Sequence, residues 1–170
     1  MTLKVSEGES KFNPGEAELI TRIVQDVFFQ RELEITEIGV VTPYVAQVRM
    51  LKRMLRNIVP EHLDPDLLEC ASVDNFQGRE KDLIIFSAVR CNRTGTVGFL
   101  ADWRRLNVML TRARKGIVIV GSSRTLKDGG SRGNQRRIRS GRTAEMLTLR
   151  RVEELVEPQI EFTLASAREM

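Results

Sequence analysis

Apolar residues recur along the chain at two spacings, and each spacing predicts a different kind of element. Steps of three and four residues predict helices with one buried face. The helices predicted in this way span about residues 14–31, 44–59, 102–114 and 143–156. Asn13, Pro14 and Glu16 mark the start of the first helix as a cap, a first-turn proline and an acid, and Pro60 closes the second.

Short continuous apolar runs predict buried strands between these helices. The predicted strands lie at about residues 37–42, 68–73, 82–89 and 116–121. Each run is apolar on both faces, as in a sheet that is covered on both sides. Strands that alternate with helices in this way predict an α/β fold with a parallel sheet.

Length and charge narrow the possible classes only slightly. The 170 residues suit about one domain, and a hydrophobic content of 41% is enough for a core. Lys+Arg number 27 against Asp+Glu 23, a formal +4 that permits a nucleic-acid partner and fits a solvated basic surface equally well. Residues 124–142 carry seven Arg or Lys, one acid and four Gly, which predicts a basic loop or linker.

Membrane, secreted and metal-binding classes are disfavoured. No apolar run approaches the roughly 18 residues of a membrane helix, and residues 1–12 lack the apolar core of a secretion signal. The expected location is therefore the cytoplasm or the nucleus. Cys70 and Cys91 are far apart and match no zinc spacing, so both are expected to be reduced and no metal site is expected.

Three stretches carry candidate chemistry, each at a strand end or on the following turn, and sites in open α/β sheets cluster at the carboxyl ends of strands. In the first stretch, Thr42 offers a hydroxyl, Tyr44 a ring for stacking and Gln47 an amide. The helix start beside them offers free N–H groups to a phosphate. A strand, a turn proline and a capped helix are common without any ligand, so this stretch alone favours a structural interpretation.

The second stretch, residues 72–82, joins two predicted strands by a polar turn. Gly78 would let backbone approach a phosphate closely, because no side chain intervenes. Gln77 is able to orient a water or bond a phosphate oxygen, and Glu80 is able to accept from a sugar hydroxyl. An ordinary charged connection explains the same residues, and spacing alone leaves the two interpretations even.

The third stretch is the predicted helix at residues 102–114. At about 100° per residue, it buries one side and gathers polar and basic side chains on the other. The polar side comprises Arg104, Arg105, Asn107, Thr111 and Arg112. Arginine suits phosphate because its planar fork binds two oxygens and keeps its charge. A solvated basic face is the common alternative, but such faces mix signs, and no acid follows Asp102 in this helix.

Two features that a complete nucleotide site would need are missing from the sequence. The chain contains no GxxxxGK[ST] loop to cradle phosphates, and no apolar strand that ends in paired acids to hold Mg²⁺ beside one. The chain thus has arginines suited to bind an anion but no nucleotide pocket of its own. This combination predicts a domain that completes a site built elsewhere.

Together the three stretches resemble superfamily 1 helicases of the B branch, the group that contains the nonsense-mediated-decay RNA helicase and senataxin. Residues 71–92 (ASVDNFQGREKDLIIFSAVRCN) resemble motif V of this family, and residues 98–122 (GFLADWRRLNVMLTRARKGIVIVGS) resemble motif VI. Residues 38–48 and 13–17 resemble segments that precede motif V. The resemblance implies the second of two RecA-like domains, a P-loop NTPase-type fold without the Walker A loop.

The resemblance also implies a role for each candidate residue in ATP hydrolysis. Arg112, the first arginine of TRAR, would be the arginine finger that reaches the γ-phosphate. Gly78 would contact that phosphate through its amide, with Gln77 beside it, and Glu80 would bind the ribose. The residues implied to brace motif VI or touch neighbouring phosphates are Arg105 and Arg114. ATP and Mg²⁺ are the implied cofactors, with Mg²⁺ held by the first domain.

The implied partners are single-stranded nucleic acid, with RNA favoured over DNA, and a first RecA-like domain in cis or in trans. Translocation is expected to run from 5′ to 3′. The residues implied to line the single-strand path are Thr42, Tyr44, Gln47 and Ser72. The resemblance fades after Ser122, and Trp103 stands where many relatives have proline.

The expected organisation is an N-terminal extension at 1–12, the second RecA-like domain at 13–123, a basic Gly/Arg-rich loop or linker at 124–142, and a C-terminal helix and tail at 143–170. The main functional hypothesis is half of an ATP-dependent helicase that hydrolyses no ATP alone. The alternative is a non-catalytic module that binds nucleic acid or a helicase. A nuclease is disfavoured because Glu80 and Lys81 are adjacent, whereas the common metal-nuclease pattern separates its Glu and Lys by one residue.

Overall fold

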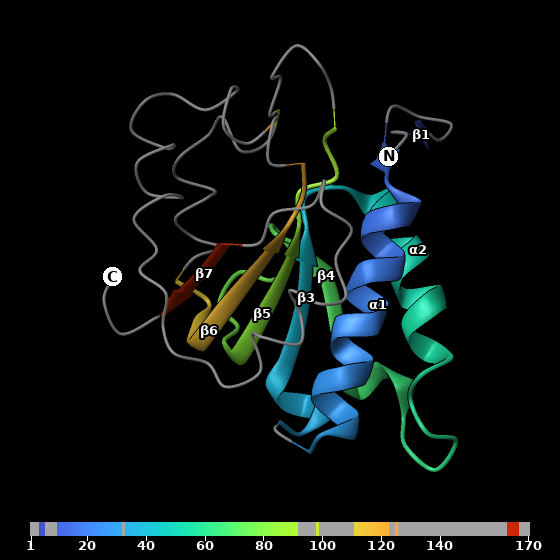
Figure 1. The fold of residues 1–170 in the computed structure, drawn as a ribbon, viewed down its shortest axis with the longest axis vertical. Helices are drawn as coiled ribbons and strands as arrows, with labels where there is room; N and C mark the ends of the chain where they lie inside the picture. Colours follow the sequence, from blue (N-terminus) through green and yellow to red (C-terminus); the bar gives the residue numbers. More distant parts are fainter. Residues whose placement is uncertain are drawn as a thin grey trace.

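The structure, a computed structural model, describes residues 4–5, 10–31, 33–91, 98, 111–122, 125 and 163–166. Its main feature is a five-stranded sheet in the order β4-β3-β5-β6-β7 (Figure 1). The strands are β3 (Ile38–Thr42), β4 (Glu69–Ser72), β5 (Lys81–Ser87), β6 (Ala113–Val120) and β7 (Thr163–Ser166). β4, β3, β5 and β6 run parallel, and β7 runs antiparallel to β6. The expected α/β, RecA-like parallel sheet is therefore confirmed.

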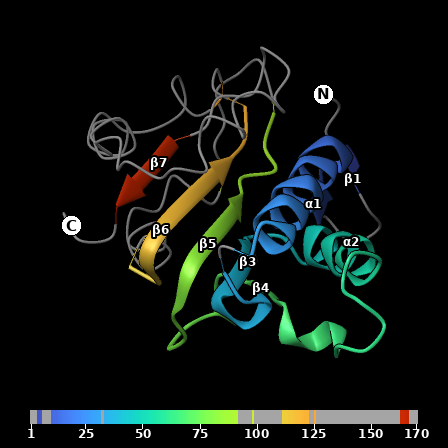
Figure 2. The same ribbon diagram turned by 60° about the horizontal axis from the view of Figure 1, so that its bottom comes forward.

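Two helices, α1 (Pro14–Phe29) and α2 (Val45–Arg56), pack against each other on one face of the sheet (Figure 2). α1 begins as predicted, because Asn13 Oδ1 accepts a hydrogen bond from Glu16 N at 3.3 Å. The short elements are the 3₁₀ helices η1 (Ile35–Glu37) and η2 (Pro65–Leu67), and a separate pair of antiparallel strands, β1 (Lys4–Val5) and β2 (Lys11–Phe12).

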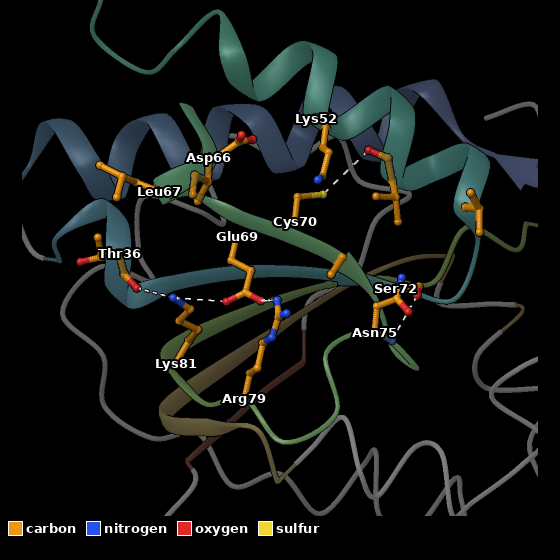
Figure 3. Close-up of a pocket in the computed structure, with 14 residues that line it drawn as sticks. Thr36, Lys52, Asp66, Leu67, Glu69, Cys70, Ser72, Asn75, Arg79 and Lys81 are labelled. Carbon is orange, nitrogen blue, oxygen red and sulfur yellow. Dashed lines mark hydrogen bonds and ion pairs between the residues drawn. The ribbon is translucent and has the colours of Figure 1, made fainter. Parts of the chain in front are cut away.

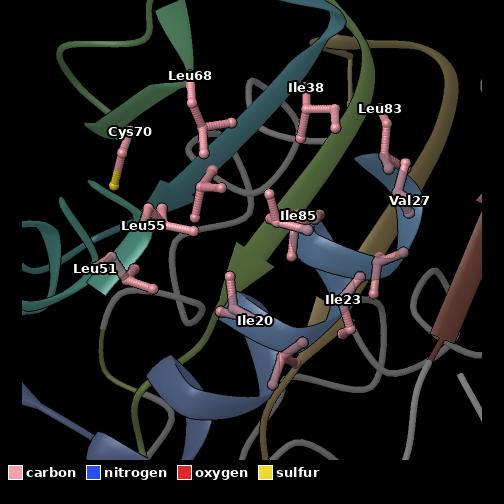
Figure 4. Packing of buried hydrophobic residues seen from close by; sticks show 14 of the residues in the cluster. Ile20, Ile23, Val27, Ile38, Leu51, Leu55, Leu68, Cys70, Leu83 and Ile85 are labelled. Carbon is pink, nitrogen blue, oxygen red and sulfur yellow. The ribbon is translucent and has the colours of Figure 1, made fainter. Parts of the chain in front are cut away.

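Both faces of the sheet are buried, because alternate residues of each strand point to opposite sides. Ile38 and Val40 of β3 belong to the larger apolar cluster, which the helices cover with residues such as Ile20 and Leu51 (Figure 4). Val41, one residue further along, belongs to a smaller cluster on the other face. Strands that are apolar on both faces therefore occur as the sequence pattern predicts.

The connection between β4 and β5 crosses one face of the sheet. Because β3 lies between those two strands, residues 73–80 run from the carboxyl end of β4 past β3 to the amino end of β5. Phe76, in the middle of this crossing, is 1% exposed and packs in the smaller cluster, away from the helices. A Cβ built at Gly39 of β3 would lie 2.9 Å from Phe76 Cζ, so glycine at this position makes room for the ring.

The helix predicted at residues 102–114 is wrong at its carboxyl end. Thr111 and Arg112 form a turn, and Ala113 begins β6. Pairing with β5 accounts for the difference, since Lys81 N donates to Arg112 O at 3.0 Å and Lys81 pairs with Ala113. These inter-strand bonds outweigh the helical periodicity of the side chains. The rest of the predicted helix lies outside the described residues.

β7 is a strand in a region where only a helix and a tail were expected. It pairs with β6 from Gly116, opposite Ser166, to Ile119, opposite Thr163. Its four residues, TLAS, are too few to give a periodic pattern, and the unpaired edge of β6 supplies the bonds that form it. The helix predicted at residues 143–156 lies outside the described part of the chain.

Candidate functional site

The candidate residues lie at two opposite edges of the parallel sheet. The amino edge, where β5 and β6 begin, carries Gln77, Gly78, Glu80, Arg112 and Arg114. The carboxyl edge, where β3 and β4 end, carries Thr42, Tyr44 and Ser72. Since β3 has five residues, the edges lie roughly 17 Å apart.

The second and third stretches therefore place their candidate residues at the amino ends of strands, and not at the carboxyl ends as the sequence pattern suggested. Ser72 ends β4, but the crossing that follows carries Gly78 and Glu80 to the start of β5. Arg112 and Arg114 flank the start of β6 at the same edge. Gly78 and Glu80 follow β4 in the sequence, but the crossing of eight residues brings them to the start of β5.

At the amino edge, two stretches far apart in the sequence meet directly. Lys81 N donates to Arg112 O at 3.0 Å, and Arg114 Nε lies 3.5 Å from Glu80 Oε2. The Arg112 side chain is half-buried, and its Nη2 donates to Thr111 Oγ1 at 3.3 Å. Arg112 therefore belongs to the turn before β6, and it stands beside the residues that follow Gly78.

The turn that carries Gly78 is open to solvent. Gly78 has a φ of +79°, in the left-handed region that favours glycine, and a Cβ built there would meet no atom within 4 Å. Gln77 and Glu80 on either side of it are exposed. A ligand is thus able to approach the backbone of this turn from outside. Arg105, the other arginine expected here, lies outside the described residues.

Charged groups next to this turn hold it to the start of β4. Arg79 forms an ion pair with Glu69, and Lys81 Nζ lies 3.4 Å from Glu69 Oε2 (Figure 3). Lys81 Nζ also donates to Thr36 O at 2.7 Å. The charges at Arg79 and Lys81 therefore fix this part of the chain to β4, whereas Glu80 pairs with Arg114 at the start of β6.

A hollow of about 760 Å³ runs along β4, the edge strand of the sheet (Figure 3). Its lining includes Glu69, Arg79 and Lys81 from the amino edge and Ser72 and Asn75 from the carboxyl edge. Asn75 N donates to Ser72 Oγ at 3.3 Å, which fixes the start of the crossing. The hollow therefore reaches from one candidate edge to the other.

Tyr44 at the carboxyl edge is paired with Arg90, a residue outside the three candidate stretches. Arg90 Nε donates to the Tyr44 hydroxyl at 2.9 Å, and the guanidinium carbon lies 5.9 Å from the centre of the ring. Both side chains are half-buried. The available signal was position: Arg90 follows the end of β5, and the carboxyl ends of parallel strands meet at one edge.

Gln47 and Thr42, two of the four residues expected along the single-strand path, are fully buried. The Gln47 amide accepts from Asn13 N at 2.8 Å and donates to Asn13 O at 3.2 Å and to Ser87 Oγ at 3.1 Å. Its bonding groups are thus used inside the protein, and none of them faces solvent. Thr42 is 0% exposed, and its hydroxyl has no hydrogen-bond partner among the described residues.

Glu16 is a fully buried carboxyl group, and it shares its partners Asn13 and Ser87 with Gln47. Its Oε2 accepts from Ser87 Oγ at 2.7 Å and from Val89 N at 2.8 Å, and its Oε1 accepts from Asn13 Nδ2 at 3.1 Å. Burial raises the pKa of Glu16 from 4.5 to about 7, although the three hydrogen bonds act to lower it. The side chains that bond it are neutral, so no opposite charge offsets its desolvation.

This raised pKa predicts that the protein is less stable at higher pH. The folded state holds the Glu16 proton more tightly than the unfolded chain, so this stabilisation is complete below about pH 4.5 and is lost as pH rises through about 7. A shift of this size corresponds to a loss of roughly 3 kcal/mol at most. Urea unfolding near pH 5 and near pH 8 measures this difference in the free energy of unfolding. Glu16→Gln should abolish the part of the difference that comes from Glu16. An equal pH dependence in both proteins would contradict the assignment.

The described residues contain no group of three or more His, Cys, Asp or Glu that could hold a metal ion, and their two cysteines are free. None of the described helices is long and apolar enough to cross a membrane.

Comparison of the sequence with known proteins identifies several relatives. Residues 2–124 match the family model described as an AAA domain. The chain is 42% identical over 128 residues to DNA-binding protein SMUBP-2 of Mesocricetus auratus, covering 75% of the chain and 12% of the relative. ATP-dependent helicase NAM7 of Saccharomyces cerevisiae is 47% identical over 125 residues, covering 71% and 12%. DNA polymerase alpha-associated DNA helicase A of the same yeast is 41% identical over 125 residues, covering 72% and 17%. The chain thus spans less than a fifth of each relative.

Proposed function

We propose that this chain, which belongs to the AAA-domain family as a superfamily 1 helicase domain, is the second RecA-like half of an ATP-driven helicase. In this role residues 13–123 complete an ATP site whose phosphate-binding loop lies on a first domain. The observation that carries the proposal is the junction at the amino edge, where the bond from Lys81 N to Arg112 O joins the start of β5, three residues after Gly78, to the turn that carries Arg112.

The donors at the amino edge suit the outer phosphates and the sugar of ATP. Arg112 would supply a guanidinium that keeps its charge to the γ-phosphate, as an arginine finger does. The exposed backbone of Gly78 would bond the same phosphate, with Gln77 beside it to orient a water. Glu80 would accept from the ribose. Arg114, and Arg105 beyond the described residues, would touch neighbouring phosphates.

The cofactors that fit this edge are ATP and a Mg²⁺ ion that the first domain would hold. Guanidinium and backbone N–H groups bind anionic oxygens, and they repel a cation. The described residues contain no group of three or more His, Cys, Asp or Glu that could hold a metal ion. Mg²⁺ would neutralise phosphate charge, while this chain supplies the arginine and the turn.

The carboxyl edge would contact single-stranded nucleic acid, with RNA favoured over DNA. Tyr44 offers a ring on which a base is able to stack, and Ser72 offers a hydroxyl at the end of β4 on the same edge. The printed names of the relatives include a DNA-binding protein and a DNA helicase, and the preference for RNA comes from the resemblance to the nonsense-mediated-decay RNA helicase.

The proposal is tested by joining the chain to the first RecA-like domain of a relative. The 170-residue chain alone should hydrolyse no ATP, because it lacks a Walker A loop. The joined protein should hydrolyse ATP, and single-stranded RNA should stimulate it. The second candidate function, a non-catalytic binding module, is motivated by the basic stretch at residues 124–142. It predicts salt-dependent RNA binding by the chain and no stimulated turnover in a folded joined protein.

A further inference from the structure

Tyr44 and Arg90 form one unit at the carboxyl edge. The bond from Arg90 Nε to the Tyr44 hydroxyl, at 2.9 Å, sets the guanidinium near the ring. Gly98 packs on this pair: a Cβ built there would lie 2.9 Å from both Arg90 Nε and the Tyr44 hydroxyl. A ring joined to a guanidinium offers a single strand a stacking surface and a phosphate contact together.

The backbone that carries Arg90 is held in a strained conformation. Val89 has a φ of +66°, which is rare for a β-branched residue, and Arg90 N bonds back to Ala88 O at 2.7 Å. Strain of this kind persists only where surrounding contacts impose it. The contacts here come from α1: Val89 N donates to Glu16 Oε2 at 2.8 Å, and Asn13 Nδ2 donates to Val89 O at 3.3 Å.

The same buried cluster also fixes the other member of the pair. Tyr44 is the N-cap residue of α2, and Gln47 in the first turn of that helix bonds Ser87 Oγ and both backbone groups of Asn13. Ser87 Oγ in turn donates to Glu16 Oε2 at 2.7 Å. Glu16 is therefore linked to the backbone before Arg90 and, through Ser87 and Gln47, to the helix start that carries Tyr44.

We propose that Glu16 is a positioning residue for nucleic-acid binding, and that it holds Arg90 against Tyr44 so that the pair binds a single strand. The proposal rests on the proposed function, because it requires that the carboxyl edge contacts nucleic acid. Glu16 itself is fully buried and acts only through the pair. Its ionised carboxyl accepts from three donors, whereas glutamine would turn an NH₂ group toward at least one of them.

The test measures the affinity of the full 170-residue chain for a short fluorescent oligouridylate by anisotropy, near pH 8. Arg90→Ala should weaken binding by about 5- to 100-fold, because it removes the phosphate contact and also the support of the ring on which a base stacks. Glu16→Gln should weaken it by a similar factor. Glu18→Gln, at an exposed position of the same helix, is the matched control and should leave the affinity unchanged.

A double-mutant cycle separates positioning from general damage to the fold. If Glu16 acts through the pair, Glu16→Gln in the Arg90→Ala background should cause no further loss of affinity. Tyr44→Phe, which leaves the buried cluster intact, should also weaken binding, by a smaller factor. Losses that add in the double variant, or wild-type affinity in both Arg90→Ala and Tyr44→Phe, would overturn the proposal. If the wild-type chain and the joined two-domain protein both fail to bind the oligonucleotide, the proposed function of the carboxyl edge fails as well.

Discussion

Replacing Arg112 by alanine should lower the ATP turnover of the joined two-domain protein by about 10³-fold or more. An arginine finger stabilises charge that develops on the transferred phosphoryl group, and its loss has effects of this order. Arg112 lies at the amino edge, where its backbone oxygen accepts a hydrogen bond from Lys81 N at the start of β5. Single-stranded-RNA-stimulated phosphate release measures the change.

The control for this experiment is Arg53→Ala, which removes an exposed arginine from α2 without touching the amino edge. It should leave turnover within about twofold of the parent, since an exposed helix position takes no part in the chemistry. Arg112→Lys keeps the charge but loses the planar fork, so its turnover should lie between those of Arg112→Ala and Arg53→Ala. A loss of less than tenfold in Arg112→Ala would remove the arginine-finger role.

Replacing Phe76 by alanine should have the largest effect on stability, about 3–5 kcal/mol. The ring is 1% exposed and fills the space above Gly39, where it anchors the crossing from β4 to β5. Removing it leaves a cavity under residues 73–80, so the turn with Gly78 should lose its place as well. The free energy of unfolding, from urea titration of the 170-residue chain, measures the effect.

Phe29→Ala is the matched control, because that ring is 64% exposed at the end of α1. Its unfolding free energy should stay within about 0.5 kcal/mol of the parent. An equal, small change in both variants would mean that Phe76 does not anchor the crossing.

The elements predicted best are those whose own residues decide their structure. α1 has a cap, a first-turn proline and a regular apolar face, so the sequence locates it within two residues of its observed end at Phe29. β3 and β5 are continuous apolar runs and occur where predicted. Here local signals and tertiary packing favour the same structure.

The errors arise where distant parts of the chain decide the structure. Ala113 fits a helical face, but bonds to β5 place it in a strand. Gln47 looks like an exposed amide near a strand end, yet Asn13 and Ser87, which are far from it in the sequence, enclose it. Arg90 became a candidate only when the sheet order brought it to Tyr44. Periodicity reports which face a residue occupies, and it carries no information on which segments meet.

The most direct measurement is a crystal structure of the joined two-domain protein with a non-hydrolysable ATP analogue and single-stranded RNA. The account predicts the γ-phosphate at the amino edge, within hydrogen-bond distance of the Arg112 guanidinium and the Gly78 amide, and the RNA at the opposite edge beside Tyr44. A nucleotide bound at the carboxyl edge, or an Arg112 side chain turned away from the phosphates, would contradict it.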